Sequence, residues 1–104
     1  MCPKDIIEKI QVMAALQRKE ICGVVLKDNT IIPIKNVSSS HNTFVFDKRE
    51  WFTLLNTKPD ILCIYHSHLN GNTEPSETDL NCQNIIMYDF LIVAGNDWSY
   101  TPYA

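Results

Sequence analysis

Two apolar segments restrict the fold of this 104-residue chain more than any other feature. Residues 61–66 (Ile-Leu-Cys-Ile-Tyr-His) and 90–94 (Phe-Leu-Ile-Val-Ala) are almost continuously apolar and do not alternate with polar residues. In a strand with one face in water, apolar and polar residues alternate along the sequence. A strand covered on both faces is an unbroken run of apolar residues. We therefore predict two central strands of a sheet whose two faces are both covered by other elements.

Three segments have the pattern of the helices that could cover such a sheet. Apolar residues recur at helical spacing over residues 5–19 and again over residues 48–56. Ser76 can begin a third helix that runs to about residue 85, because a serine oxygen accepts a hydrogen bond from the first helical turn.

The remaining strands are predicted outside the two central ones. Residues 21–26 and 30–34 flank turn-forming residues, which indicates a hairpin. Pro33 has no backbone N–H to donate, so its strand belongs at an edge of the sheet or leaves that position unpaired. Two more strands are expected at 43–47, where the residues alternate as they would in a strand, and at 98–101.

The resulting order is helix, three strands, helix, strand, helix and two strands. This order predicts an α/β (α+β) fold in which helices flank one mixed β-sheet. A chain of this length supports one domain, residues 1–104, and is too short for a second. With 45% hydrophobic and 20% charged residues, the composition is that of an ordinary globular protein.

Charge and hydropathy argue against two classes of partner. The formal charge is −3 and the basic residues form no run, so no surface for a nucleic-acid backbone is expected. No apolar stretch approaches the roughly 20 residues of a membrane span, and residues 1–4 do not open a signal peptide. We expect a cytoplasmic protein.

The four cysteines are expected to be free thiols. Cys2, Cys22, Cys63 and Cys82 have neither the spacing of a zinc finger nor that of a small disulfide-rich domain. Cys22 and Cys63 lie inside apolar runs and are predicted to pack in the core, as free cysteine often does.

His66, Ser67 and His68 carry the clearest chemical signal. Alternate side chains of an extended strand project to the same face, so the two imidazoles can converge on one ion while Ser67 points away. Two histidines at this spacing also occur by chance, and alone they do not decide between a metal site and a coincidence. His41, in a serine-rich loop, is expected to be exposed and is not counted as a ligand.

Asp79 and Glu20 each have two interpretations. Ser76 followed by Asp79 is an ordinary capping box, but such a cap would also hold the Asp79 carboxylate and the Ser76 hydroxyl in fixed places near the histidines. Glu20 could be a solvated residue at a helix end, or it could project from the sheet edge toward the end of the 61–66 strand. Two imidazoles and a carboxylate are ligands of an open zinc site, and a further glutamate could act as its base.

Taken together, these residues resemble the signature of the JAMM (JAB1/MPN/Mov34) zinc metallopeptidases. The matching pattern is Glu20-x-x-Gly23, then His66-x-His68, seven residues, Ser76, two residues and Asp79. The resemblance extends over nearly the whole chain, because the order of elements also looks like that of the catalytic domain of this family. It implies a JAB1/MPN-like fold with cytidine-deaminase-like layering.

Within the family, four shorter segments are most similar to phage tail assembly proteins related to the lambda tail protein K. They are Pro33 to Val37, Phe44 to Asp47, Tyr65 to His68, and Asp89 to Val93 followed by Trp98. One departure is Leu69, which stands where the family usually has proline and so predicts a different loop path over the metal.

The resemblance implies a zinc-dependent peptidase or isopeptidase. It assigns His66, His68 and Asp79 as Zn²⁺ ligands, Glu20 as the base and Ser76 as a group that stabilises the oxyanion. The implied partners are a protein or peptide substrate and other phage tail-tip proteins, in the host cytoplasm or the virion tail. Two alternatives stay open: a structural tail-tip component that acts by docking, and a cellular peptidase that trims a ubiquitin-like sulfur-carrier protein.

Overall fold

The computed structural model of the protein describes residues 2–40 and 43–103, so His41 lies outside the described residues. Three helices and five strands follow one another along the chain. They are α1 (Lys4–Ala15), β1 (Cys22–Leu26), β2 (Ile31–Ile34), α2 (Lys48–Asn56), β3 (Ile61–Ser67), α3 (Glu77–Ile86), β4 (Phe90–Ala94) and β5 (Asp97–Thr101).

The five strands form one mixed sheet in the order β2-β1-β3-β4-β5. The β3 and β4 strands are parallel, and the other neighbouring pairs are antiparallel. The two strands predicted to be covered on both faces are therefore neighbours inside the sheet, and all five residues of β4 are buried. Pro33 lies in the edge strand β2, as its missing N–H requires.

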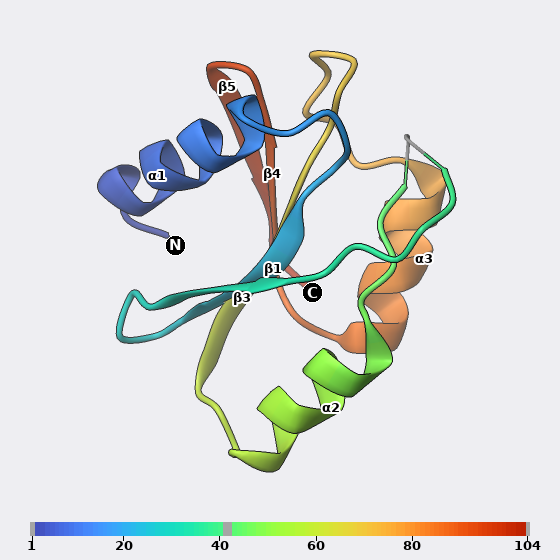
Figure 1. Ribbon diagram of the computed structural model, residues 1–104. Helices are drawn as coiled ribbons and strands as arrows, with labels where there is room; N and C mark the ends of the chain where they lie inside the picture. Colours follow the sequence, from blue (N-terminus) through green and yellow to red (C-terminus); the bar gives the residue numbers. More distant parts are fainter. Residues whose placement is uncertain (1, 41–42, 104) are drawn as a thin grey trace.

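Helices cover both faces of this sheet (Figure 1). On one face α1 packs its buried isoleucines, Ile6, Ile7 and Ile10, against the inner strands. On the other face lie α2 and α3, with a core cluster that includes Phe44, Phe46 and Phe90. The prediction of a mixed sheet flanked by helices is confirmed.

Gly23 is needed where β1 passes beneath a buried aromatic ring. It pairs with Tyr65 across the β1–β3 ladder. A Cβ atom at residue 23 would lie closer than 3.0 Å to the Tyr65 ring and to the Ile32 carbonyl oxygen. Only glycine leaves room for Tyr65 to lie across β1. This close contact explains why position 23, three residues after Glu20, is a glycine.

Two predicted elements differ from the structure. The helix predicted over residues 5–19 ends at Ala15, because beyond it Leu16 is 78% exposed and meets no core. The strand predicted over residues 43–47 is wrong: the segment makes only an isolated bridge between Asn36 and Phe46. Its phenylalanines do alternate into the core, but part of its backbone bonds to the Asn36 side chain rather than to a strand.

The cysteines are free in the described structure, and Cys22 and Cys63 are buried, as predicted. Within residues 2–40 and 43–103, no helix has the length and apolar character that crossing a membrane requires.

Candidate metal centre

The pairing of β1 with β3 brings Glu20 to the histidines. Cys22 pairs with His66, and just beyond this pair Ile21 N–H donates to Ser67 Oγ at 2.9 Å while Ser67 N–H donates to the Ile21 carbonyl at 3.0 Å. One step further along the same antiparallel register, Glu20 stands beside His68. The glutamate and the histidines are 46 or more residues apart in sequence, and only this register makes them neighbours.

Three side chains converge at the end of β3. His66 Nε2 lies 3.1 Å from Asp79 Oδ1, His68 Nε2 lies 2.9 Å from Asp79 Oδ2, and the two Nε2 atoms are 3.2 Å apart. Among the described residues, these three form the single group of histidine, cysteine and acidic side chains close enough to share one metal ion.

The start of α3 holds Asp79 in this position. Ser76 is the N-cap: its Oγ accepts a hydrogen bond from Asp79 N–H at 3.0 Å, and Asp79 Oδ2 accepts one from Ser76 N–H at 2.9 Å. This is a complete capping box. The two interpretations made from the sequence are thus compatible, because the same bonds that cap the helix direct the carboxylate at His66 and His68.

A backbone carbonyl determines which nitrogen of His68 is free. His68 Nδ1 lies 2.7 Å from the Asn72 carbonyl oxygen, which can only accept a hydrogen bond, so Nδ1 carries the proton. In neutral His68 the lone pair then sits on Nε2, which faces the Asp79 carboxylate. Two electron-rich atoms 2.9 Å apart need a cation between or beside them, either a proton or a metal ion.

The pKa shifts follow from this crowding. The hydrogen bond to Asp79 raises the pKa of His68, while complete burial lowers the pKa of His66. Burial alone would raise the pKa of Asp79, but the hydrogen bonds from both histidines outweigh it and hold that pKa well below its usual range. Asp79 therefore stays an anion, as a metal ligand must.

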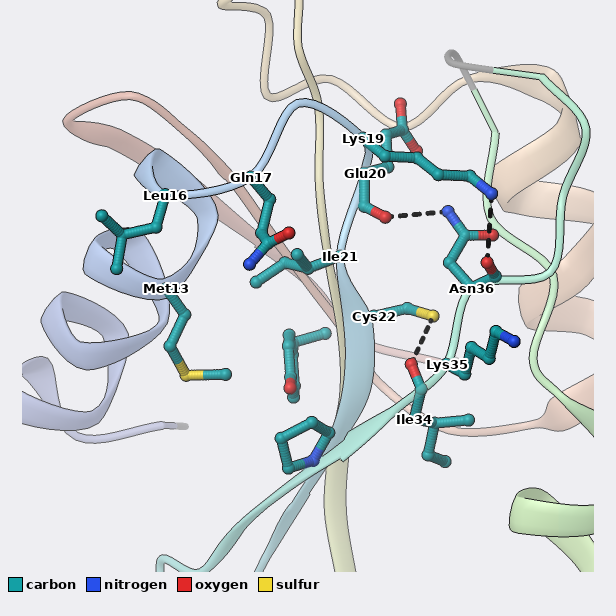
Figure 2. Close-up of a pocket in the computed structure, with 12 residues that line it drawn as sticks. Met13, Leu16, Gln17, Lys19, Glu20, Ile21, Cys22, Ile34, Lys35 and Asn36 are labelled. Carbon is teal, nitrogen blue, oxygen red and sulfur yellow. Dashed lines mark hydrogen bonds between the residues drawn. The ribbon is translucent and has the colours of Figure 1, made fainter.

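Glu20 is a buried acid beside this group. Its side chain is only 3% exposed, and its Oε1 atom has no hydrogen-bond partner within the described structure. Burial raises the pKa of Glu20 to about 7, with His68 acting in the opposite direction. The backbone of Glu20, unlike this side-chain oxygen, has a hydrogen-bond partner: Asn36 Nδ2 donates to the Glu20 carbonyl oxygen at 2.8 Å (Figure 2).

A cavity of about 440 Å³ opens beside these residues. Glu20, His68 and Ser76 contribute to its wall, and the loop between β3 and α3 provides the rest: Leu69, Asn70, Asn72, Glu74 and Pro75. A group bound in this cavity would therefore lie beside Glu20, His68 and Ser76 together.

A family model described as prokaryotic homologs of the JAB domain matches residues 4–102. The chain belongs to this family. The match covers nearly the whole chain, from the first residue of α1 to just beyond the end of β5. No curated protein sequence matches the chain.

Solved structures agree with this JAB fold. A protein of Desulfitobacterium hafniense is 20% identical with a TM-score of 0.67, over 93% of this chain and 77% of that one. A JAB1/MPN domain protein from Archaeoglobus fulgidus is 19% identical with a TM-score of 0.65, over 94% and 84% of the two chains. A protein of Salinibacter ruber is 22% identical with a TM-score of 0.57, over 94% of this chain and 78% of that one. At these identities the likeness concerns the fold.

The three candidate ligands of the JAB domain fit a tetrahedral metal ion. Bonds of about 2.0–2.1 Å to such an ion separate neighbouring ligand atoms by about 3.3 Å, and here the separations are 2.9 to 3.2 Å. The two imidazole nitrogens and the Asp79 carboxylate, whose Oδ1 faces His66 and whose Oδ2 faces His68, could therefore hold a divalent metal with a further position left for another ligand.

The structure places all five predicted site residues together: His66, His68, Asp79, Glu20 and Ser76. Their roles as ligands, base and oxyanion group stay predictions. Sequence reasoning missed the Asn72 carbonyl and Asn36, which orient His68 and the Glu20 backbone. It also missed Phe44, which stacks on His66. The pattern of Phe44 and Phe46 indicated a strand and gave no sign of a contact with a histidine.

Proposed function

We propose that this JAB homologue is a zinc-dependent peptidase or isopeptidase that acts on a protein or peptide. One observation carries the proposal. Two imidazole Nε2 atoms and the two oxygens of the Asp79 carboxylate meet at 2.9 to 3.2 Å, directly beside a buried glutamate that takes no part in their contacts. A purely structural metal site has no use for such a glutamate, whereas hydrolysis requires a base.

Zinc is the metal that best matches the donor set. Three protein ligands drawn from histidine and acidic residues, with one position open, are typical of catalytic zinc, whereas structural zinc sites have four protein ligands. His66, His68 and Asp79 would hold the ion. When bound, Zn²⁺ supplies a Lewis acid that polarises a carbonyl and activates water near neutral pH.

Glu20 would move the proton. A carboxylate beside the open position of the metal can accept a proton and release it again, so Glu20 could take one from the attacking water and deliver it to the leaving amine. The Ser76 Oγ accepts the Asp79 N–H bond, and its own hydroxyl proton is left to donate to the oxygen on which negative charge develops.

A cleavage assay with one substitution tests the proposal. Zinc-loaded protein is incubated with a peptide library in ¹⁸O-labelled water, and new carboxyl ends are detected by mass spectrometry. We expect cleavage by the unchanged protein, and a loss of about 100-fold or more in Glu20→Gln with its zinc retained. Glu74→Gln is the matched control, because Glu74 lines the same cavity but is exposed. Cleavage by Glu20→Gln at the unchanged rate would remove Glu20 from the reaction.

The resemblance to phage tail assembly proteins gives a more specific proposal: tail-tip proteins as substrates or docking partners. If the protein acts by docking alone, Glu20→Gln should support tail assembly as well as the unchanged protein does. Cleavage confined to the C-terminus of a ubiquitin-like sulfur-carrier protein would instead favour the cellular peptidase.

A further inference from the structure

His66 differs from most metal-ligating histidines in one respect. Such histidines usually donate their second ring N–H to a carbonyl, a carboxylate or a water, and that bond fixes the ring orientation. His68 does so through the Asn72 carbonyl. His66 Nδ1 is completely buried and has no hydrogen-bond partner in the described part of the chain. No hydrogen bond at this second ring nitrogen therefore orients the His66 imidazole.

Two phenylalanine rings enclose the His66 imidazole. Phe44 stacks on it, with ring centroids 4.4 Å apart and an angle of 27° between the planes. Phe90 meets it edge-on, with centroids 5.6 Å apart and an angle of 78°. Rotation of the imidazole out of its plane would bring it into these rings, so close packing can replace the missing hydrogen bond.

The Asn36 side chain bonds to the backbone on both sides of Phe44. The Asn36 Nδ2 donates to the Thr43 carbonyl at 3.3 Å, and Oδ1 accepts from Val45 N–H at 3.0 Å, so both neighbours of Phe44 are bonded to it. The same Nδ2 also donates to the Glu20 carbonyl (Figure 2). Asn36 thus connects the segment that touches a candidate ligand to the segment that carries the candidate base.

We propose that Phe44 is a positioning residue that holds the His66 imidazole in the orientation required for metal binding. The proposal rests on the zinc site described above and concerns how that site is preorganised. Without the stacked ring, His66 gains rotational freedom that it must lose again when the ion binds, and the affinity for zinc falls.

Phe46 provides a matched control. It lies two residues away on the same segment and is 9% exposed, against 8% for Phe44. Its ring contacts the rings of Trp51 and Phe44. Within the residues that the structure describes, it makes no ring contact with His66. Phe44→Leu and Phe46→Leu therefore remove the same atoms from the same core cluster, but only the first removes the stack on His66.

The experiment measures zinc affinity by competition with a chromophoric chelator, and unfolding of the metal-free variants by urea. We expect both variants to lose similar stability and Phe44→Leu to bind zinc about 10-fold or more weakly than Phe46→Leu. The Co²⁺-substituted Phe44→Leu should also show an altered visible d–d spectrum, which a loss of stability alone would not produce. Phe44→Tyr keeps a ring on His66 and should restore both affinity and spectrum.

Equal zinc affinities and Co²⁺ spectra for Phe44→Leu and Phe46→Leu would overturn the proposed role of Phe44. They would not contradict the zinc site itself. Failure of the unchanged protein to bind zinc would overturn the metal centre itself, and the role of Phe44 with it. If Phe44→Leu does not fold, Phe44→Met replaces it, since its flexible side chain fills core space without a ring. The same comparison then applies.

Discussion

Glu20→Gln should stabilise the metal-free protein at neutral and alkaline pH. Glu20 is buried, one of its oxygens has no partner, and its pKa is raised by burial to about 7 from an ordinary value of 4.5. Glutamine has nearly the shape of protonated glutamate but never ionises. The substitution therefore removes the unfavourable burial of a charge and leaves the packing of the site almost unchanged.

The sign and size follow from proton linkage. Below pH 4.5 Glu20 is protonated in both the folded and the unfolded chain and has no effect on the pH dependence of stability. Between pH 4.5 and about 7 the unfolded chain releases the proton while the folded chain keeps it, so stability falls as pH rises. This loss is about 1 kcal/mol at pH 5 and about 3 kcal/mol at pH 8.

The assay is urea unfolding in the presence of a chelator, at several pH values from 5 to 8. The free energy of unfolding of Glu20→Gln minus that of the unchanged protein should grow by about 2 kcal/mol across this range. His66, His68 and Asp79 titrate in both proteins, and taking the difference removes most of their contribution. Glu8→Gln, with an exposed side chain on α1, should show no such growth.

A difference that stays constant from pH 5 to 8 would refute the reasoning, since it would mean that the folded protein does not raise the pKa of Glu20. A difference that shrinks with rising pH would mean that a positive charge stabilises the carboxylate. Addition of zinc should reduce the pH dependence, because a nearby cation favours the ionised form of Glu20.

Three further predictions concern the scaffold and the ligands. Gly23→Ala should destabilise the protein by about 1–3 kcal/mol in urea unfolding, because the new methyl group overlaps the Tyr65 ring; Val12→Ala, at an exposed site on α1, should change stability far less. Zinc should raise the thermal midpoint of the unchanged protein but not that of His68→Ala; an equal rise in both would exclude His68 as a ligand. Ser76→Ala should lose about 1 kcal/mol of stability with the helix cap, and its zinc affinity should fall because Asp79 is no longer held; unchanged affinity would show that the cap does not position Asp79.

Much of the fold could be predicted because its signals are local. The unbroken apolar runs identified β3 and β4, Pro33 identified an edge strand, and Ser76 with Asp79 identified the start of α3. The segment from 43 to 47 was predicted wrongly, because alternation reports which side chains are buried and does not report which backbone groups are paired.

The sequence by itself determined which residues could form the candidate site, since the spacing of His66, His68, Ser76 and Asp79 depends on short-range geometry within one strand, one loop and one helix start. Only the tertiary structure decided that Glu20 stands beside His68, that Asn72 selects the free nitrogen of His68, and that Phe44 encloses His66. Two of these contacts join segments more than 20 residues apart, and all three depend on strand register, loop path and core packing. Local sequence patterns do not encode those features.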